Sequence, residues 1–72
     1  MAMTKEFGVL AEQFSGIQLP LRVMRSNAGA YIGTEHPEDG SPFSRESKEY
    51  FAAPEEALHA LVTGNWTQRE HP

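Results

Sequence analysis

The sequence contains no cysteine among its 72 residues, so neither a disulfide nor a thiolate metal site is available to it. It also lacks any run of eighteen uncharged apolar residues and any apolar stretch of signal-peptide length near its start. These absences predict a soluble, cytoplasmic protein with no membrane partner. A chain this short forms one domain, residues 1–72, and needs an apolar core or a partner chain for its stability.

Motifs for catalysis and ligand binding are missing as well. The sequence has no glycine-rich phosphate loop, no G-x-S-x-G elbow and no H-E-x-x-H pair. A serine nucleophile needs an adjacent base, and no motif places any of the three histidines, His36, His59 and His71, beside a serine. The acidic residues around His36 do not have the spacing of a calcium loop. We therefore predict no enzymatic activity, no metal site and no cofactor.

What the sequence does contain is the balance of a folded protein, with 39% apolar residues and a net charge of −4. Its charge is unevenly distributed. Residues 17–34 carry Arg22 and Arg25 and no acid, whereas residues 35–60 have a net charge of −5. This asymmetry favours association with a charged partner or with a second copy of the chain. A solvated surface of uneven charge is the alternative.

The first half of the chain predicts a short helix followed by a hairpin. Apolar residues recur at helical spacing before Gly16, with an extended N-terminal arm as the alternative: Phe7, Leu10, Ala11 and Phe14. Residues 17–24 then alternate with a period of two, which predicts a half-buried strand interrupted at Pro20. Residues 26–29, SNAG, predict a tight turn into a second strand, AYIGT.

The second half predicts one more strand and a helix. Residues 36–40 supply Pro37 and Gly40 for a turn, and the polar stretch after them places the third strand from about Ser47 to Phe51. A helix is expected over residues 54–63, with Pro54 in its first turn and Gly64 just beyond its end. Residues 1–5 and 68–72 are expected to fray. The fold class is α+β, a three-stranded antiparallel β-meander packed by a C-terminal helix, with a short N-terminal helix.

The expected core consists of large apolar residues from all these elements. They are Phe14, Ile17, Leu19, Leu21, Val23, Tyr31, Phe51, Leu58, Leu61, Val62 and Trp66. A core of this size gives a thin margin of stability, and a three-stranded sheet leaves unpaired edges. Self-association into a homodimer is therefore an expected form of the protein.

The stretch SPFSRESKEYF, residues 41–51, raises the main functional question. Serines beside a glutamate in a loop commonly bind nearby backbone, which would make this segment scaffolding. Arg45 and Glu46, together with Arg22 and Arg25, are the candidate partner-binding residues of a non-catalytic protein-interaction or regulatory module. The alternative is a nucleic-acid-binding sheet that uses Tyr31 and the three arginines, although an isoelectric point near 5.2 disfavours it.

Three segments between residues 31 and 69 resemble short bacterial proteins of uncharacterised function: YIGT, SRES.EYF and EEALHAL..G.WTQR. The resemblance implies a compact bacterial protein of the class just described. It brings no activity and no binding residues with it.

Overall fold

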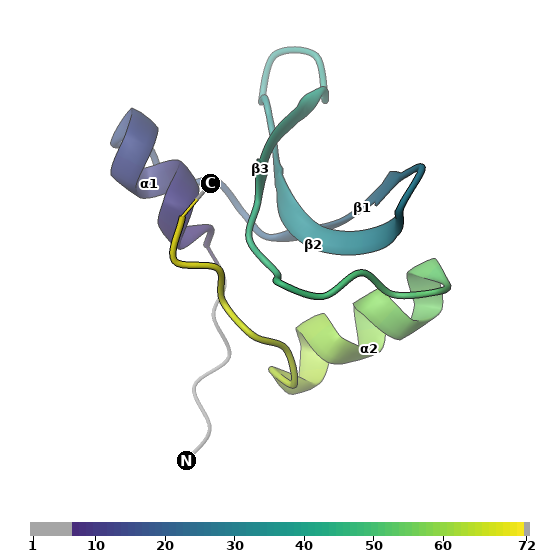
Figure 1. Cartoon of the computed structure of the whole chain (residues 1–72). Coiled ribbons are helices and arrows are strands. Elements are labelled where there is room, and N and C mark those ends of the chain that lie inside the picture. Colours follow the sequence, from purple (N-terminus) through teal and green to yellow (C-terminus); the bar gives the residue numbers. More distant parts are fainter. Residues whose placement is uncertain (1–6, 72) are drawn as a thin grey trace.

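The computed structural model describes residues 7–71, which form two helices and one three-stranded sheet (Figure 1). The elements in chain order are α1 (Val9–Ser15), β1 (Arg22–Ser26), β2 (Gly29–Glu35), β3 (Pro42–Arg45) and α2 (Pro54–Thr63). All neighbouring strands are antiparallel, in the order β1-β2-β3. The predicted α+β class, with a meander, a C-terminal helix and a short N-terminal helix, is confirmed.

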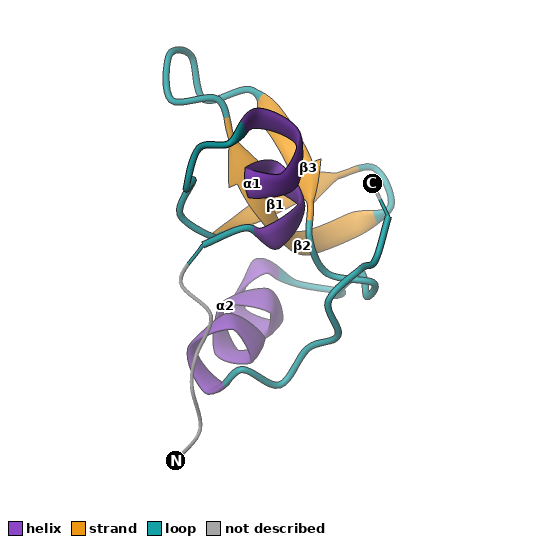
Figure 2. Ribbon diagram, turned by 90° about the vertical axis from the view of Figure 1, so that its left-hand side faces the viewer, coloured by secondary structure: helices purple, strands orange, loops and turns teal. Residues whose placement is uncertain are grey.

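Both helices cover the same face of the sheet. Ile32 and Thr34 are two residues apart on β2, so their side chains point to the same face. Ile32 is fully buried in a cluster with Leu21, the residue just before β1, and Ala60 of α2. Thr34 is fully buried beneath the start of α1, which packs against β3. Figure 2 shows the two helices in front of and below the strands.

Helix α2 begins and ends where the sequence predicts. Pro54 occupies its first turn, Glu55 and Glu56 lie near its positive N-terminal end, and Gly64 takes a left-handed conformation at φ 75° just after it. None of the helices in residues 7–71 has the length and apolarity needed to cross a membrane.

The first strand begins later than predicted. The turn at residues 27–28 and the pairing of Ser26 with Gly29 confirm the hairpin, but the ladder extends only from Arg22 to Ser26. Leu19 and Leu21 are buried as the alternation requires, whereas Ile17 is exposed. The residues before Arg22 lead from α1 to the sheet and make a single bridge there, between Pro20 and Phe7.

The predicted third strand, Ser47 to Phe51, is wrong as a regular strand. The sheet uses Pro42–Arg45 instead, and its pairing with β2 shifts register between Thr34 and Glu35. Ser47 and Phe51 make only isolated bridges. The polarity of SPFSRES misleads here, because Ser44 and Thr34 bond to one another and so allow a polar strand to pack inside.

The predicted core is correct in part. Leu19, Leu21 and Tyr31 are buried, and Phe51, Leu61 and Trp66 are half-buried against the core, but the prediction omits Ile32 and Ala30 of β2 and is wrong for Phe14, Ile17, Leu58 and Val62. Phe14 is 66% exposed and Val62 65% exposed, and Leu58 is exposed as well. The buried residues of the helices are instead mostly small, which allows the helices to pack closely against the rest of the fold. They are Leu10, Ala11, Ala57 and Ala60.

The C-terminal segment bonds to the rest of the fold. The expected fraying of residues 1–5 lies outside the described residues. At the other end, where residues 68–72 are expected to fray, residues 68 and 69 bond to the segment after β3. The Arg69 amide donates to the Glu46 carbonyl at 2.7 Å, and Gln68 bridges Ser47. The C-terminal segment therefore forms part of the folded unit.

Candidate functional site

The four residues Ser44–Ser47 divide into three that are bound inside the protein and one that lies on its surface. Glu46 and Ser47 are fully buried, and Ser44 is half-buried. Arg45 is also half-buried, but its cross-strand partner is Gly33, on the sheet face opposite the helices. The segment thus contributes separately to the interior and to one outer face.

The carboxylate of Glu46 joins three parts of the chain. Its two oxygens accept hydrogen bonds from the amides of Leu10 and Ala11 at 3.0 and 3.1 Å, two of the N–H groups that lack an intrahelical partner in the first turn of α1. They also accept bonds from the Ser44 hydroxyl at 2.6 Å and the Gln68 side-chain amide at 2.8 Å. Glu46 therefore serves as a cap for α1 from a distant part of the sequence, and it holds the C-terminal segment at the same point.

The two serines complete this internal network. Ser44 uses its only proton toward Glu46, so Thr34 donates to the Ser44 oxygen at 2.6 Å. Ser47 accepts the amide of Ile32 at 3.0 Å and donates to the carbonyl of Glu49 at 2.9 Å. Both hydroxyls thus bond within the protein. For these two serines, this supports the interpretation of the segment as scaffolding.

The pKa of Glu46 is lowered from its ordinary value. Burial by itself raises this pKa, but the hydrogen bonds from Ser44, Leu10, Gln68 and Ala11 stabilise the charged form more strongly. The buried carboxylate is therefore ionised, and its charge faces the positive end of α1.

A dependence of stability on pH follows from this pKa. A carboxyl group whose pKa is depressed by folding adds stability above its ordinary pKa of 4.5, and this contribution is lost as the pH falls through the lower folded value. We expect the difference in unfolding free energy between the wild type and Glu46→Gln to be largest near neutral pH and to shrink below pH 4.5. Urea unfolding at a series of pH values measures it. A difference that stays constant into the acid range contradicts the assignment. Asp39 and Glu49, whose pKa values are also lowered, remain in both proteins.

On the outer face, Arg45 and Tyr50 form a stacked pair. The guanidinium carbon of Arg45 lies 4.5 Å from the centre of the Tyr50 ring, and its Nη1 donates to the Tyr50 hydroxyl. Tyr31 meets the Tyr50 ring edge-on, with centroids 6.0 Å apart. Burial, and then Tyr50, raises the pKa of Tyr31, while Arg45 lowers it. The Nε of Arg45 is buried and has no hydrogen-bond partner among the described residues.

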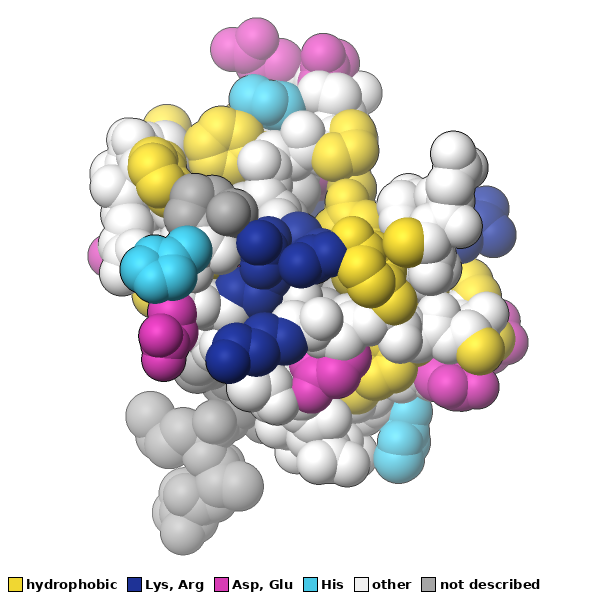
Figure 3. All heavy atoms as spheres, viewed as in Figure 1, with side chains coloured by type: hydrophobic (Ala, Val, Ile, Leu, Met, Phe, Trp, Pro, Cys, Tyr) yellow, Lys and Arg dark blue, Asp and Glu magenta, His cyan; other side chains and the backbone are white. Residues whose placement is uncertain are grey.

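Two further cations lie beside this pair. The Arg69 Nη1 donates to the Arg45 carbonyl at 3.3 Å, and Lys48 lines one hollow together with Arg69. Figure 3 shows Lys and Arg side chains gathered over the lower end of β3, next to apolar side chains over β2. We call Arg45, Lys48, Arg69 and Tyr50 the basic face.

Carboxylates do not neutralise the basic face directly. None of its three cations forms an ion pair with a carboxylate in the described part of the chain, although Glu70 borders the adjacent hollow of ≈ 220 Å³ with Lys48, Arg69 and His71. Three of the six basic residues and none of the ten acidic residues belong to the basic face, so the rest of the chain has a net charge of −7. Glu70 borders the face, and Glu49 lies close enough to Lys48 for their charges to interact. The protein combines an acidic whole with a local basic surface.

The structure does not bring the four predicted partner-binding residues together. Arg22 pairs with Glu35 at 2.9 Å, and Arg25 lies farther along β1, near the hairpin turn. Arg45 belongs to the basic face, whereas the Glu46 carboxylate is inside the protein. Sequence reasoning missed Lys48 and Arg69. Their proximity depends on the bridge between Ser47 and Gln68, for which the sequence carries no signal.

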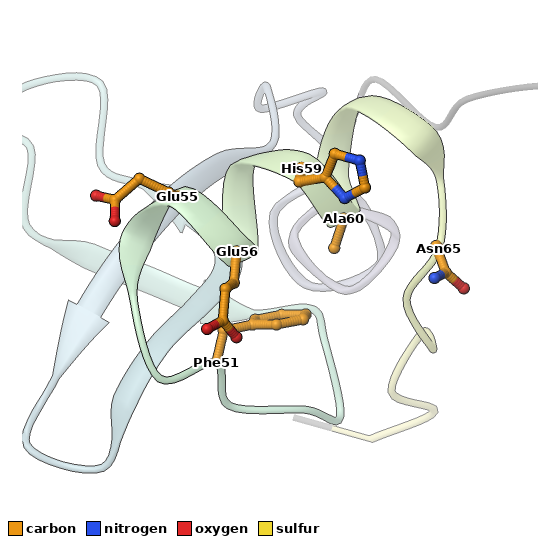
Figure 4. A pocket seen from close by; sticks show the side chains of 6 residues that line it. All are labelled: Phe51, Glu55, Glu56, His59, Ala60 and Asn65. Carbon is orange, nitrogen blue, oxygen red and sulfur yellow. The ribbon is translucent and has the colours of Figure 1, made fainter.

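Another hollow lies along α2, away from the basic face. Figure 4 shows Phe51 and Ala60 on its floor, with Glu56 and His59 projecting from the helix and Asn65 at one end. It is open, has a volume of ≈ 560 Å³, and is acidic at its rim. Within residues 7–71, no three histidine or carboxylate side chains come together as they would around a metal ion.

Comparisons with protein-family models, with curated proteins and with solved structures find no match to this chain. Any functional assignment therefore depends on the site geometry described above.

Proposed function

We propose that this chain is a small, non-catalytic interaction module that binds an acidic segment of a partner protein on its basic face. The observation that carries the proposal is the presence, around an exposed tyrosine, of three cations that form no ion pair with a carboxylate of residues 7–71, on a protein whose remaining charge is strongly negative. A surface of this kind attracts carboxylates locally, whereas the remaining, acidic surface of the chain repels them.

The chemistry of the face suits carboxylates. Arg45 is held in place by Tyr50, so it loses little side-chain freedom on binding, and guanidinium groups bind carboxylates with paired hydrogen bonds. Arg69 and Lys48 offer additional donors beside it. Tyr50 is 43% exposed and supplies apolar contact area to a bound segment.

Nucleic acid is the second candidate, and a specific observation favours it. An exposed tyrosine beside arginines is the arrangement on which single-stranded bases stack. However, one side of the Tyr50 ring is already occupied by Arg45, and the net charge of −7 elsewhere repels a long polyanion. A protein segment with a few carboxylates avoids that repulsion.

A binding titration tests the proposal. The probes are a fluorescein-labelled peptide with a run of glutamates and a labelled oligothymidylate of equal charge, each followed by fluorescence anisotropy at low ionic strength. We expect the peptide to bind, and the Arg45→Gln and Arg69→Gln variants to weaken it by roughly tenfold each, since each removes a charge-assisted contact. Arg25→Gln, a loss of equal charge outside the basic face, is expected to have little effect.

Three results would count against this function. The first is no peptide binding at low salt, and the second is equal loss in all three variants, which indicates a general charge effect. The third is tighter binding of the oligonucleotide, which favours the second candidate. Circular dichroism of each variant separates a loss of binding from a loss of fold.

A further inference from the structure

The outer edge of β1 has free backbone hydrogen-bonding groups. In the antiparallel ladder, Ala30 and Ile32 direct their N–H and C=O groups away from β1, where Phe51, Glu46 and Ser47 bind them. Their partners across the ladder, Arg25 and Val23, must therefore direct theirs toward the opposite, open edge. No residue in 7–71 binds these groups.

The opposite side of the sheet is protected. β3 has only four residues, starts with Pro42, and pairs through a register shift between Thr34 and Glu35. Helix α1 also packs against it. These are among the features by which natural sheets block edge pairing. β1 is also short and carries Arg22 and Arg25, but it has no proline and no register shift within Arg22–Ser26.

Helix α2 carries an apolar flank on the same side as this open edge. Successive helical residues turn by about 100°, so Leu58 and Val62 lie on one flank of the helix. Glu56 lies on the other flank, and Ala60 lies between that flank and the core. Phe51 lies by Glu56 and Ala60, and it pairs with β2 on the side away from β1 (Figure 4). Leu58 and Val62 therefore face the β1 side, where they are 53% and 65% exposed.

We propose that a second copy of this chain occupies the β1 edge, so that two sheets join into one of six strands. A twofold axis beside Met24 places Val23 of each copy opposite Arg25 of the other. Each such pair exchanges two backbone hydrogen bonds, and all four free N–H and C=O pairs at the edge are satisfied. An isologous contact of this kind closes after two copies.

The position of α2 favours a second copy over an extended peptide. Helix α2 packs against both β1 and β2. Strands are about 4.8 Å apart, so a helix over these two strands lies roughly one strand spacing from the twofold axis, and this brings the two copies of α2 to roughly 10 Å from one another. Packed helices are typically about 8–10 Å apart. Leu58 and Val62 are then buried between the helices, and a single peptide strand offers no such contact.

Charge and size limit the strength of this dimer. Arg22 is neutralised by Glu35 of its own copy, but the two Arg25 side chains lie diagonally across the new strand pair, about 7–8 Å apart at the backbone. Salt screens their repulsion and is expected to strengthen the dimer. A standard interface takes about 800 Å² per partner, roughly one sixth of the 4858 Å² surface of this chain. We expect one strand edge and one helix flank to bury an area at the low end of what specific interfaces use. The dimer is therefore expected to dissociate on dilution.

Sedimentation velocity of the full chain over a concentration series tests the proposal. We expect the mass to rise from 8.0 kDa toward twice that value as concentration increases. Arg25→Pro removes one free edge N–H from each copy without removing a ladder bond, and it is expected to raise the dissociation constant by roughly tenfold or more. Arg25→Ser, which keeps the N–H and removes the same charge, is its matched control and should dimerise at least as well as the wild type.

A second pair of variants examines the helix contact. Leu58→Gln is expected to weaken the dimer, whereas Glu56→Gln, on the flank near Phe51, should leave it unchanged. A monomer at every concentration overturns the proposal and leaves the β1 edge to another segment or another protein. A dimer that Arg25→Pro and Leu58→Gln do not weaken also overturns it, because such a dimer uses a different surface. Peptide binding to the basic face is independent of either outcome.

Discussion

Replacing Glu46 with alanine is expected to lower the free energy of unfolding by about 3–5 kcal/mol, as when one partner of a buried charged network is removed. The substitution leaves four donors without their acceptor: the amides of Leu10 and Ala11, the Ser44 hydroxyl and the Gln68 amide. A domain of this length has a total stability of roughly 4–11 kcal/mol, so the variant is expected to be largely unfolded or to retain a small part of the wild-type stability. Urea unfolding followed by circular dichroism measures the change.

Two comparison variants make this result specific to the network. Glu46→Gln keeps the shape and one acceptor oxygen, so its loss should be intermediate, at about 2 kcal/mol. Glu38→Gln changes the same charge on an exposed turn and is expected to alter stability by less than about 0.5 kcal/mol. If Glu46→Ala proves as mild as Glu38→Gln, the internal role of Glu46 is wrong.

Replacing Gly33 with alanine is expected to cost about 3 kcal/mol or more, the upper range for overpacking a well-packed interior. A Cβ atom here would lie 2.2 Å from the carbonyl oxygen of Ser44 and 2.9 Å from the Tyr31 ring. The first of these atoms belongs to the backbone of β3, so the strand itself must move and carry Arg45 and Glu46 with it. Thermal and urea unfolding measure the loss.

Gly64→Ala is the matched control for that substitution. Gly64 has a φ of 75° but no atom within 4 Å of its added Cβ, so only the strain of the left-handed conformation applies, at about 1 kcal/mol. Equal losses at the two positions would mean that the close contact between β2 and β3 is absent.

The sequence predicts those parts of the fold that depend on local chemistry. The bounds of α2 follow from Pro54, Glu55, Glu56 and Gly64, and the hairpin follows from the turn before Gly29. The buried residues of the helices cannot be predicted from local chemistry in the same way. Large apolar residues dominate a hydrophobicity pattern, but close contact with the sheet is made by Ala57 and Ala60, while Leu58 and Val62 are exposed.

The third strand and the role of Glu46 could not be predicted for a different reason. Both depend on residues distant in the sequence that satisfy polar groups in the interior. Ser44 is acceptable in a packed strand because Thr34 bonds to it, and Glu46 is acceptable in the interior because α1 and Gln68 surround it with donors. No local pattern indicates these pairings, so a polar stretch predicts a loop.

The SRES segment therefore has two roles that the sequence alone could not separate. Ser44, Glu46 and Ser47 fix the end of β3 against α1, β2 and the C-terminal segment. The same fixed backbone presents Arg45 to solvent beside Arg69, because Arg69 binds both the Glu46 and the Arg45 carbonyls. The internal carboxylate thereby orders the basic face on which the proposed binding function depends.

The most direct measurement of this account is an NMR titration of the Glu46 side-chain carboxyl carbon in the folded, ¹³C-labelled protein. We expect its chemical shift not to change through pH 4.5, the ordinary pKa, and to move only at lower pH or together with unfolding. A Glu46 midpoint at or above 4.5 would contradict a buried, ionised carboxylate that joins α1, β3 and the C-terminal segment.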